Sequence, residues 1–135
     1  MNDKTLIERA LIGTGWADRV AAVWIFGSRV KGRATRSSDL DVAILTEGKV
    51  SSDALLDLRS RLARELEVEV DLVDLRSASP ILCMQVIREG RLALDNIPYV
   101  RAMFVCSVPS RYYDLVRVRQ AAERQLLKRI SDGRA

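Results

Sequence analysis

The feature that most constrains the fold is an unbroken apolar segment, Val20–Phe26, which ends at Gly27. Successive side chains of a strand point to opposite faces, so this segment places apolar groups on both sides. A strand of this kind has to be covered on both faces by other elements. We therefore expect it to be a central strand of a sheet that helices flank.

Hydrophobic periodicity predicts the other elements around this strand. Helices are expected from Asp3 to Leu11, from a Ser51 or Ser52 cap to Leu66, from Ser79–Pro80 to Gly90, and from Pro98 to about Ile130 with a break near Pro109. Strands are expected over 39–45, 67–75 and 91–94, the last at a sheet edge. The fold class is α/β (α+β), a small mixed sheet flanked by helices, with residues 1–97 as the core and 98–135 as a helical extension of the same domain.

The composition excludes several kinds of catalysis. The chain has no histidine, and its two cysteines, Cys83 and Cys106, form no CxxC pair. Histidine-based triads and dyads are therefore excluded, and a zinc site is disfavoured. We expect two reduced thiols in apolar surroundings. Any chemistry has to use carboxylates, hydroxyls, backbone amides and metal ions.

The charge distribution bears on partners and location. Residues 101–135 hold eight Lys or Arg against three Asp or Glu, whereas residues 1–100 hold 14 against 15. The basic residues of the tail are spread out, which favours a solvated helix face, and direct nucleic-acid binding is not expected. No apolar segment approaches the roughly 20 residues of a membrane helix, and the N-terminus lacks a signal-peptide pattern. We expect a cytoplasmic chain without membrane contact.

The candidate chemistry lies between the first two predicted strands. Asp39 and Asp41 are two residues apart on a strand, so both side chains leave the same face. Two close carboxylates repel each other, and Mg²⁺ relieves that repulsion while binding substrate phosphates. Gly27 and Ser28 follow the buried strand, where backbone amides and a hydroxyl can hold phosphate. The two features together indicate metal-assisted nucleotidyl transfer.

The spacing of these residues resembles the signature of DNA-polymerase-β-like nucleotidyltransferases, in which Gly-Ser is followed after ten residues by Asp-x-Asp. Here the motif is Gly27-Ser28 and Asp39-x-Asp41. The short chain and the sequence Ser38-Asp39-Leu40-Asp41-Val42-Ala43 resemble the minimal nucleotidyltransferase (MNT) family. That family has a third carboxylate on a later strand, which Asp71 fits. Asp74 is its close competitor, but strand alternation places Asp74 on the opposite face.

The resemblance implies a two-metal reaction on ATP as co-substrate. Asp39, Asp41 and Asp71 would hold Mg²⁺ and form the catalytic set, with Asp71 helping to activate the attacking hydroxyl. Gly27 and Ser28 would hold the β and γ phosphates. Arg29 would bind the triphosphate as well. Further charge could come from the basic residues Lys31, Arg33 and Arg36.

MNT proteins of this length resemble the antitoxins of HEPN/MNT toxin–antitoxin pairs. The implied function is transfer of AMP from ATP to a hydroxyl, expected to be a tyrosine, of a HEPN ribonuclease toxin, which neutralises it. The tail tyrosines, Tyr112 and Tyr113, could then face the partner, although core packing is the favoured explanation for them. Two alternatives stay open: a small-molecule nucleotidyltransferase of the aminoglycoside-modifying type, and a non-catalytic toxin-binding module.

Overall fold

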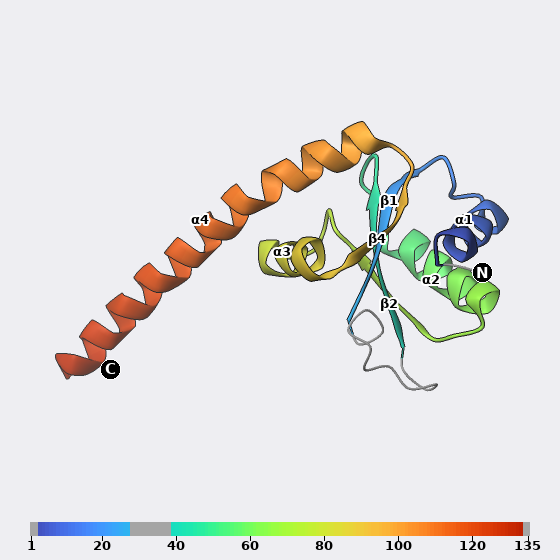
Figure 1. The fold of residues 1–135 in the computed structure, drawn as a ribbon. Helices are drawn as coiled ribbons and strands as arrows, with labels where there is room; N and C mark the ends of the chain where they lie inside the picture. Colours follow the sequence, from blue (N-terminus) through green and yellow to red (C-terminus); the bar gives the residue numbers. More distant parts are fainter. Residues whose placement is uncertain (1–2, 28–38, 134–135) are drawn as a thin grey trace.

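The apolar segment forms the central strand that the sequence predicts. In this computed structural model, which describes residues 3–27 and 39–133, β1 spans Val20–Phe26 and only its last residue is not fully buried. Neighbouring strands pair with it on both edges, and helices cover both of its faces (Figure 1). The predicted mixed sheet flanked by helices is confirmed.

The sheet has four strands in the order β3-β2-β1-β4. Its other members are β2 (Leu40–Thr46), β3 (Val70–Asp74) and β4 (Arg91–Asp95). β1 runs antiparallel to both of its neighbours, whereas β2 and β3 run parallel. The parallel pair has an important consequence, because residues in register on parallel strands point to the same face.

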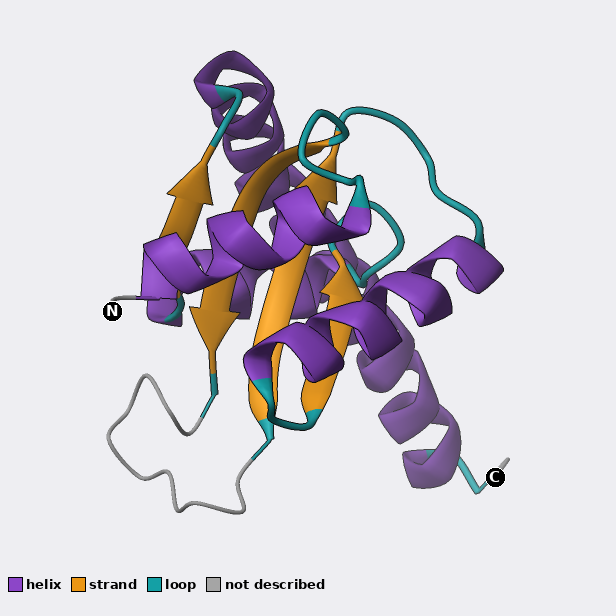
Figure 2. Ribbon diagram, turned by 90° about the vertical axis from the view of Figure 1, so that its right-hand side faces the viewer, coloured by secondary structure: helices purple, strands orange, loops and turns teal. Residues whose placement is uncertain are grey.

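Two helices cover one face of the sheet. They are α1 (Asp3–Thr14) and α2 (Ser52–Leu66), which cross the near face in Figure 2. The Ser51 hydroxyl caps α2 by accepting a hydrogen bond from the Ala54 amide at 3.2 Å, as a helix N-cap does. The core on this side unites side chains of these helices with alternate residues of the strands: Ile7, Leu11, Val23, Ile25, Val42, Ile44, Leu58 and Leu62.

The other face is covered by α3 (Pro80–Glu89) and the first part of α4 (Pro98–Ser131). Ser79 caps α3 through the Leu82 amide at 3.2 Å. The remaining alternate residues of the strands pack here, in a second core of Ala21, Trp24, Ala43, Leu45, Cys83, Val86, Phe104 and Val108. Two cores on one sheet explain why Val20–Phe26 has no polar side.

The predicted break of the last helix near Pro109 is wrong. α4 continues through Pro109 as one helix of 34 residues, whose outer part leaves the body of the protein (Figure 1). Proline removes the N–H that would bond the Val105 carbonyl. Pro109 is exposed, so water can hydrogen-bond a carbonyl left over on that side.

Three smaller expectations are also corrected. β3 begins at Val70 and not at residue 67, because Glu67 adopts a left-handed conformation (φ 54°) that closes α2. Cys83 is buried as expected, but Cys106 is exposed. Tyr113 is exposed as well, at 59%, so it is not packed in the core. Within the described ranges, every helix is too short or too polar to span a bilayer.

Candidate active site

The predicted carboxylates gather at one end of the sheet, where β1 ends and β2 begins. Asp41 and Asp71 are partners in the parallel register of β2 and β3. Their side chains therefore leave the same face, close enough for the Asp71 carboxyl to raise the pKa of Asp41. The structure thus brings together two of the three residues that the sequence predicts.

The electrostatics of this pair are unfavourable for two ionised groups. Burial raises the pKa of the Asp41 carboxyl above its ordinary value of 3.8, and the charges of Asp71 and Asp39 raise it further. Among residues 3–27 and 39–133, no basic side chain contributes to this shift. A carboxylate that faces other carboxylates in this way needs a proton or a cation.

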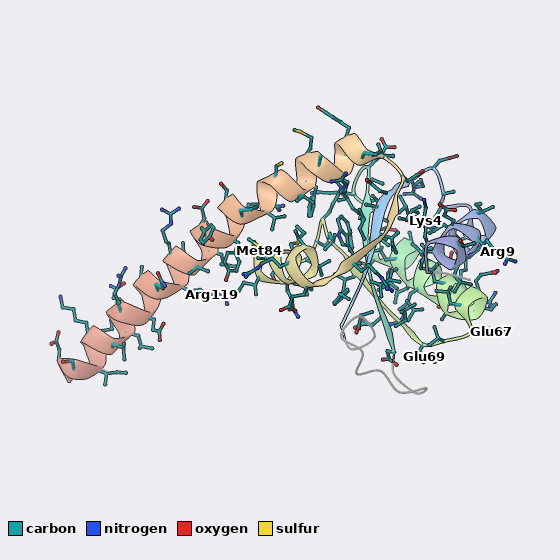
Figure 3. The ribbon with its side chains drawn as sticks, viewed as in Figure 1. Lys4, Arg9, Glu67, Glu69, Met84 and Arg119 are labelled. Atoms are coloured by element: carbon teal, nitrogen blue, oxygen red, sulfur yellow. The ribbon has the colours of Figure 1, made fainter. Side chains whose placement is uncertain are left out.

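Asp39 lies at the edge of this pair. It is exposed and directly precedes β2, so it is not a strand residue as expected. The backbone between the two aspartates is fixed, because the Leu40 amide donates a 2.8 Å hydrogen bond to the Glu69 carbonyl. Glu69 is labelled at this end of the sheet in Figure 3. Asp39 therefore contributes its charge to Asp41 from an anchored backbone.

Gly27 brings the end of β1 against the same carboxylates. Its neighbour Phe26 is the register partner of Asp41, and its own φ is +83°, a conformation that favours glycine. A Cβ at this position would overlap the Asp41 carboxylate. Both the backbone conformation and the space therefore require glycine, and a backbone without a side chain lies beside the acidic pair.

A second glycine supports this arrangement and was missed as a site feature. The sequence predicts Gly90 only as the end of a helix. Its φ is −77°, so no left-handed backbone is involved. A Cβ on Gly90 would instead lie 2.5 Å from the Val86 carbonyl oxygen and 3.3 Å from that of Ile25. Gly90 thus allows α3 and β4 to approach the end of β1, two residues before Gly27. A glycine directly between a helix and an edge strand was the only signal in the sequence.

The described residues fit a divalent cation that also binds a substrate. Mg²⁺ takes oxygen ligands, commonly one or two carboxylates together with phosphates. Asp41 and Asp71 supply two such carboxylates on one face. Within residues 3–27 and 39–133, no three acidic or cysteine side chains converge into a closed cage. The arrangement therefore suits an ion whose remaining ligands come from a phosphate substrate and water.

The competitor Asp74 is set apart from this site, as strand alternation predicts. Asp74 is buried and pairs in register with Ile44, three residues along from Asp41. Its carboxylate accepts hydrogen bonds from the Arg76 amide (3.1 Å) and the Ser77 hydroxyl (2.9 Å). It is a structural carboxylate. The predicted phosphate ligands Ser28 and Arg29, together with Lys31, Arg33 and Arg36, lie outside the described residues.

The chain is similar to known proteins over the part that carries this site. Residues 16–97 match the family model of polymerase beta nucleotidyltransferases. The chain is 37% identical to the protein adenylyltransferase MntA of Shewanella oneidensis over 103 residues, which cover 76% of this chain and 73% of that protein.

Solved structures extend the similarity to α4. A toxin–antitoxin crystal structure with AMP-PNP matches with a TM-score of 0.76 and 31% identity, over 92% of this chain and 98% of the other. A structure of the tri-AMPylated Shewanella oneidensis HEPN toxin in complex with MNT antitoxin matches with a TM-score of 0.72 and 29% identity, over 93% and 96%. With its sheet, its paired carboxylates and these matches, the chain belongs to the polymerase beta nucleotidyltransferase family, as a homologue of the MntA protein adenylyltransferases.

Proposed function

We propose that this chain is a Mg²⁺-dependent adenylyltransferase that moves AMP from ATP to a tyrosine hydroxyl of a HEPN toxin and so neutralises it. The observation that carries the proposal is the meeting of Gly27, Asp41 and Asp71 at one end of the sheet. A bare backbone beside two mutually repelling carboxylates is suited to bind a metal–nucleotide complex. The Asp41 and Asp71 carboxylates do not stabilise one another, so a bound ligand accounts better for their proximity than packing does.

The reaction assigns a role to each carboxylate. Asp39, Asp41 and Asp71 would hold Mg²⁺, which neutralises phosphate charge as the α-phosphorus is attacked. The acceptor oxygen forms a bond to the α-phosphorus, the bond to the bridging oxygen breaks, and pyrophosphate leaves. Asp71 is the exposed member of the in-register pair. It is therefore placed to take the proton of the incoming hydroxyl.

The nucleotide phosphates would lie against the end of β1. Gly27 gives the closest approach to the backbone, because a side chain there would collide with Asp41. Ser28 and Arg29 follow directly in the sequence. We propose that the Ser28 hydroxyl and the Arg29 guanidinium hold the β and γ phosphates, beside the carboxylates that bind the metal.

The relatives support the choice of a protein acceptor. One similar structure holds a toxin–antitoxin complex with AMP-PNP, and another holds an AMPylated HEPN toxin in complex with MNT antitoxin. The chain matches both over more than nine-tenths of its length. The partner would then supply the other wall of the site.

The test is covalent transfer in a purified system. The chain, a HEPN toxin, ATP and Mg²⁺ are incubated, and intact-mass spectrometry measures the toxin. We expect the partner to gain the mass of one or more AMP groups. Ser28→Ala should slow the transfer, whereas the control Ser60→Ala, an exposed position on α2, should not.

Other outcomes identify the alternatives. If the partner is neutralised without a change of mass, and Asp39→Asn/Asp41→Asn neutralises it equally well, the chain is a non-catalytic binding module. If AMP reaches an aminoglycoside but not the protein, the small-molecule activity replaces the proposal.

A further inference from the structure

The outer half of α4 carries an apolar stripe that continues a face already used for packing. At 100° per residue, positions three and four apart share one face of a helix. Phe104 and Val108 lie on the face that packs against the sheet and α3. The same face continues through Tyr112, Leu115, Val116, Ala122, Leu126 and Ile130. Only Arg119 and Glu123 interrupt it.

Burial along this stripe falls steadily while its apolar character persists. Val108 is fully buried, Tyr112 and Leu115 are half-buried, and Leu126 and Ile130 are 55% and 52% exposed. Leu127, at the border of the stripe, is 58% exposed. In Figure 3, Arg119 projects from the side of α4 on which Met84 and α3 lie. The face of α4 that packs against the sheet and α3 therefore continues into the outer part of the helix, where its side chains are exposed.

The flank of the stripe is basic. Arg111 and Arg129 are 18 residues apart, which is five full helical turns, so both border the stripe on the same side. From Ser110 to Ser131 the helix carries six Arg or Lys and two Asp or Glu. Two copies of the chain joined through this face would bring like charges together, which disfavours self-association. An apolar surface with an acidic border is complementary to it.

A cavity at the base of the stripe fits the same partner. It has a volume of about 320 Å³ and is lined by Arg76, Met103, Phe104, Ser107 and Arg111. Arg76 is held by a 2.6 Å hydrogen bond to the Thr46 carbonyl. Arg111 lies 5.2 Å from the centre of the Phe104 ring and bonds the Ser107 hydroxyl at 2.9 Å. Two anchored guanidiniums beside apolar walls suit a carboxylate side chain.

We infer that the stripe and this cavity form the surface on which the HEPN partner docks, through an apolar ridge bordered by acidic side chains, one of which enters the Arg76–Arg111 cavity. The inference rests on the proposed function for the identity of the partner. It adds that recognition uses α4, which covers the sheet face to which Asp41 and Asp71 also point but begins at the opposite end of the sheet, so that partner docking is separate from ATP binding. The comparison structures that contain a toxin match the chain across α4 as well.

The experiment compares charge placed on the stripe with the same charge placed opposite it. Leu126→Glu lies on the stripe, and Ala121→Glu is exposed on the opposite side of the helix. Binding of the same HEPN toxin is measured by calorimetry at a fixed salt concentration. We expect Leu126→Glu to weaken binding by about tenfold or more, the size of a buried anchor residue. Ala121→Glu should change it by less than about threefold.

Two further measurements separate this inference from the proposed function. ATP binding in Mg²⁺ should be equal in both variants and the wild type, and circular dichroism should show the same helix content. If both variants bind the partner as tightly as the wild type does and AMP transfer persists, the docking surface is wrong and the proposed function still stands. If Leu126→Glu alone loses partner binding but the wild type transfers no AMP, the docking surface stands and the proposed function fails. If the wild-type chain is a dimer and the Leu126→Glu variant is a monomer, the stripe binds a second copy of the chain and not the HEPN partner.

Discussion

Asp71 and Asp74 are three residues apart on the same strand, and their surroundings differ in every respect. Asp74 is buried and is held by an amide and a hydroxyl donor. Asp71 is exposed and faces another carboxylate, that of Asp41. One carboxylate is satisfied by the fold, whereas the other makes its neighbour harder to ionise.

The difference shows how a fold separates structural from functional carboxylates. Hydrogen-bond donors stabilise the charged form and close the turn after β3. Where donors are missing and like charges meet, the fold loses stability unless a ligand compensates. We therefore expect the carboxyl groups of Asp41 on β2 and Asp71 on β3 to need a bound ligand. Each prediction below challenges one side of this contrast.

The largest effect is expected for the carboxylates that face one another at the start of β2. Asp39→Asn together with Asp41→Asn should reduce AMP transfer by at least about a hundredfold, because the groups proposed to hold the metal at the transferring phosphate are lost. Thermal unfolding should show a fold of equal or slightly higher stability, since repulsion is relieved. Transfer at the wild-type rate would show that these residues are not catalytic.

Gly27→Ala should affect both stability and binding. A non-glycine residue at φ +83° costs about 1–2 kcal/mol, and the new Cβ would displace the Asp41 carboxylate. We expect a lower midpoint in urea unfolding and the loss of ATP binding. Gly48→Ala is the matched control, because nothing surrounds that position. Unchanged ATP affinity in Gly27→Ala would disprove the close approach of phosphate to this backbone.

Asp74→Ala should give the opposite pattern to the catalytic double variant. The Ser77 hydroxyl and the Arg76 amide would lose their acceptor, which costs about 1–3 kcal/mol of unfolding free energy. ATP binding and the rate of transfer should stay within about twofold of the wild type. A stable but inactive Asp74→Ala protein would mean that the two carboxylates have been assigned the wrong way round.

The smallest effect is a pH dependence in the absence of metal. The folded-state pKa of Asp41 is raised above 3.8, by burial first and then by Asp71 and Asp39. In the interval above 3.8 the folded chain binds more protons than the unfolded chain, so this group lowers stability as pH rises through it. Below that interval the penalty is absent. The melting temperature of Asp41→Asn should therefore exceed that of the wild type at neutral pH. The gap should shrink on acidification. A gap that is constant with pH would argue against carboxylate repulsion.

Most of the fold follows from local pattern in the sequence. The apolar segment Val20–Phe26, the serine caps of α2 and α3, and the alternation that separates Asp71 from Asp74 are all visible along the chain. What the pattern cannot supply is pairing between distant segments. The contact of Asp41 with Asp71 depends on the parallel register of β2 and β3, which no periodicity encodes.

Two other features needed the three-dimensional structure for a related reason. A Cβ at position 90 would meet not only the nearby Val86 carbonyl oxygen, at 2.5 Å, but also that of Ile25, 65 residues earlier in the chain, at 3.3 Å. The continuity of α4 through Pro109 depends on which side of the helix is exposed. Local propensity is evaluated one segment at a time, whereas these outcomes are decided by what lies next to the segment.

The central claim is that Asp39, Asp41 and Asp71 form a metal-dependent nucleotide site, and titration calorimetry with ATP tests it most directly. The purified wild-type chain is titrated once with Mg²⁺ present and once with excess chelator. The proposed site predicts clear binding in Mg²⁺ that largely disappears in chelator, because ATP phosphates without the cation are repelled by the carboxylates. Equal affinity for ATP under both conditions would contradict it.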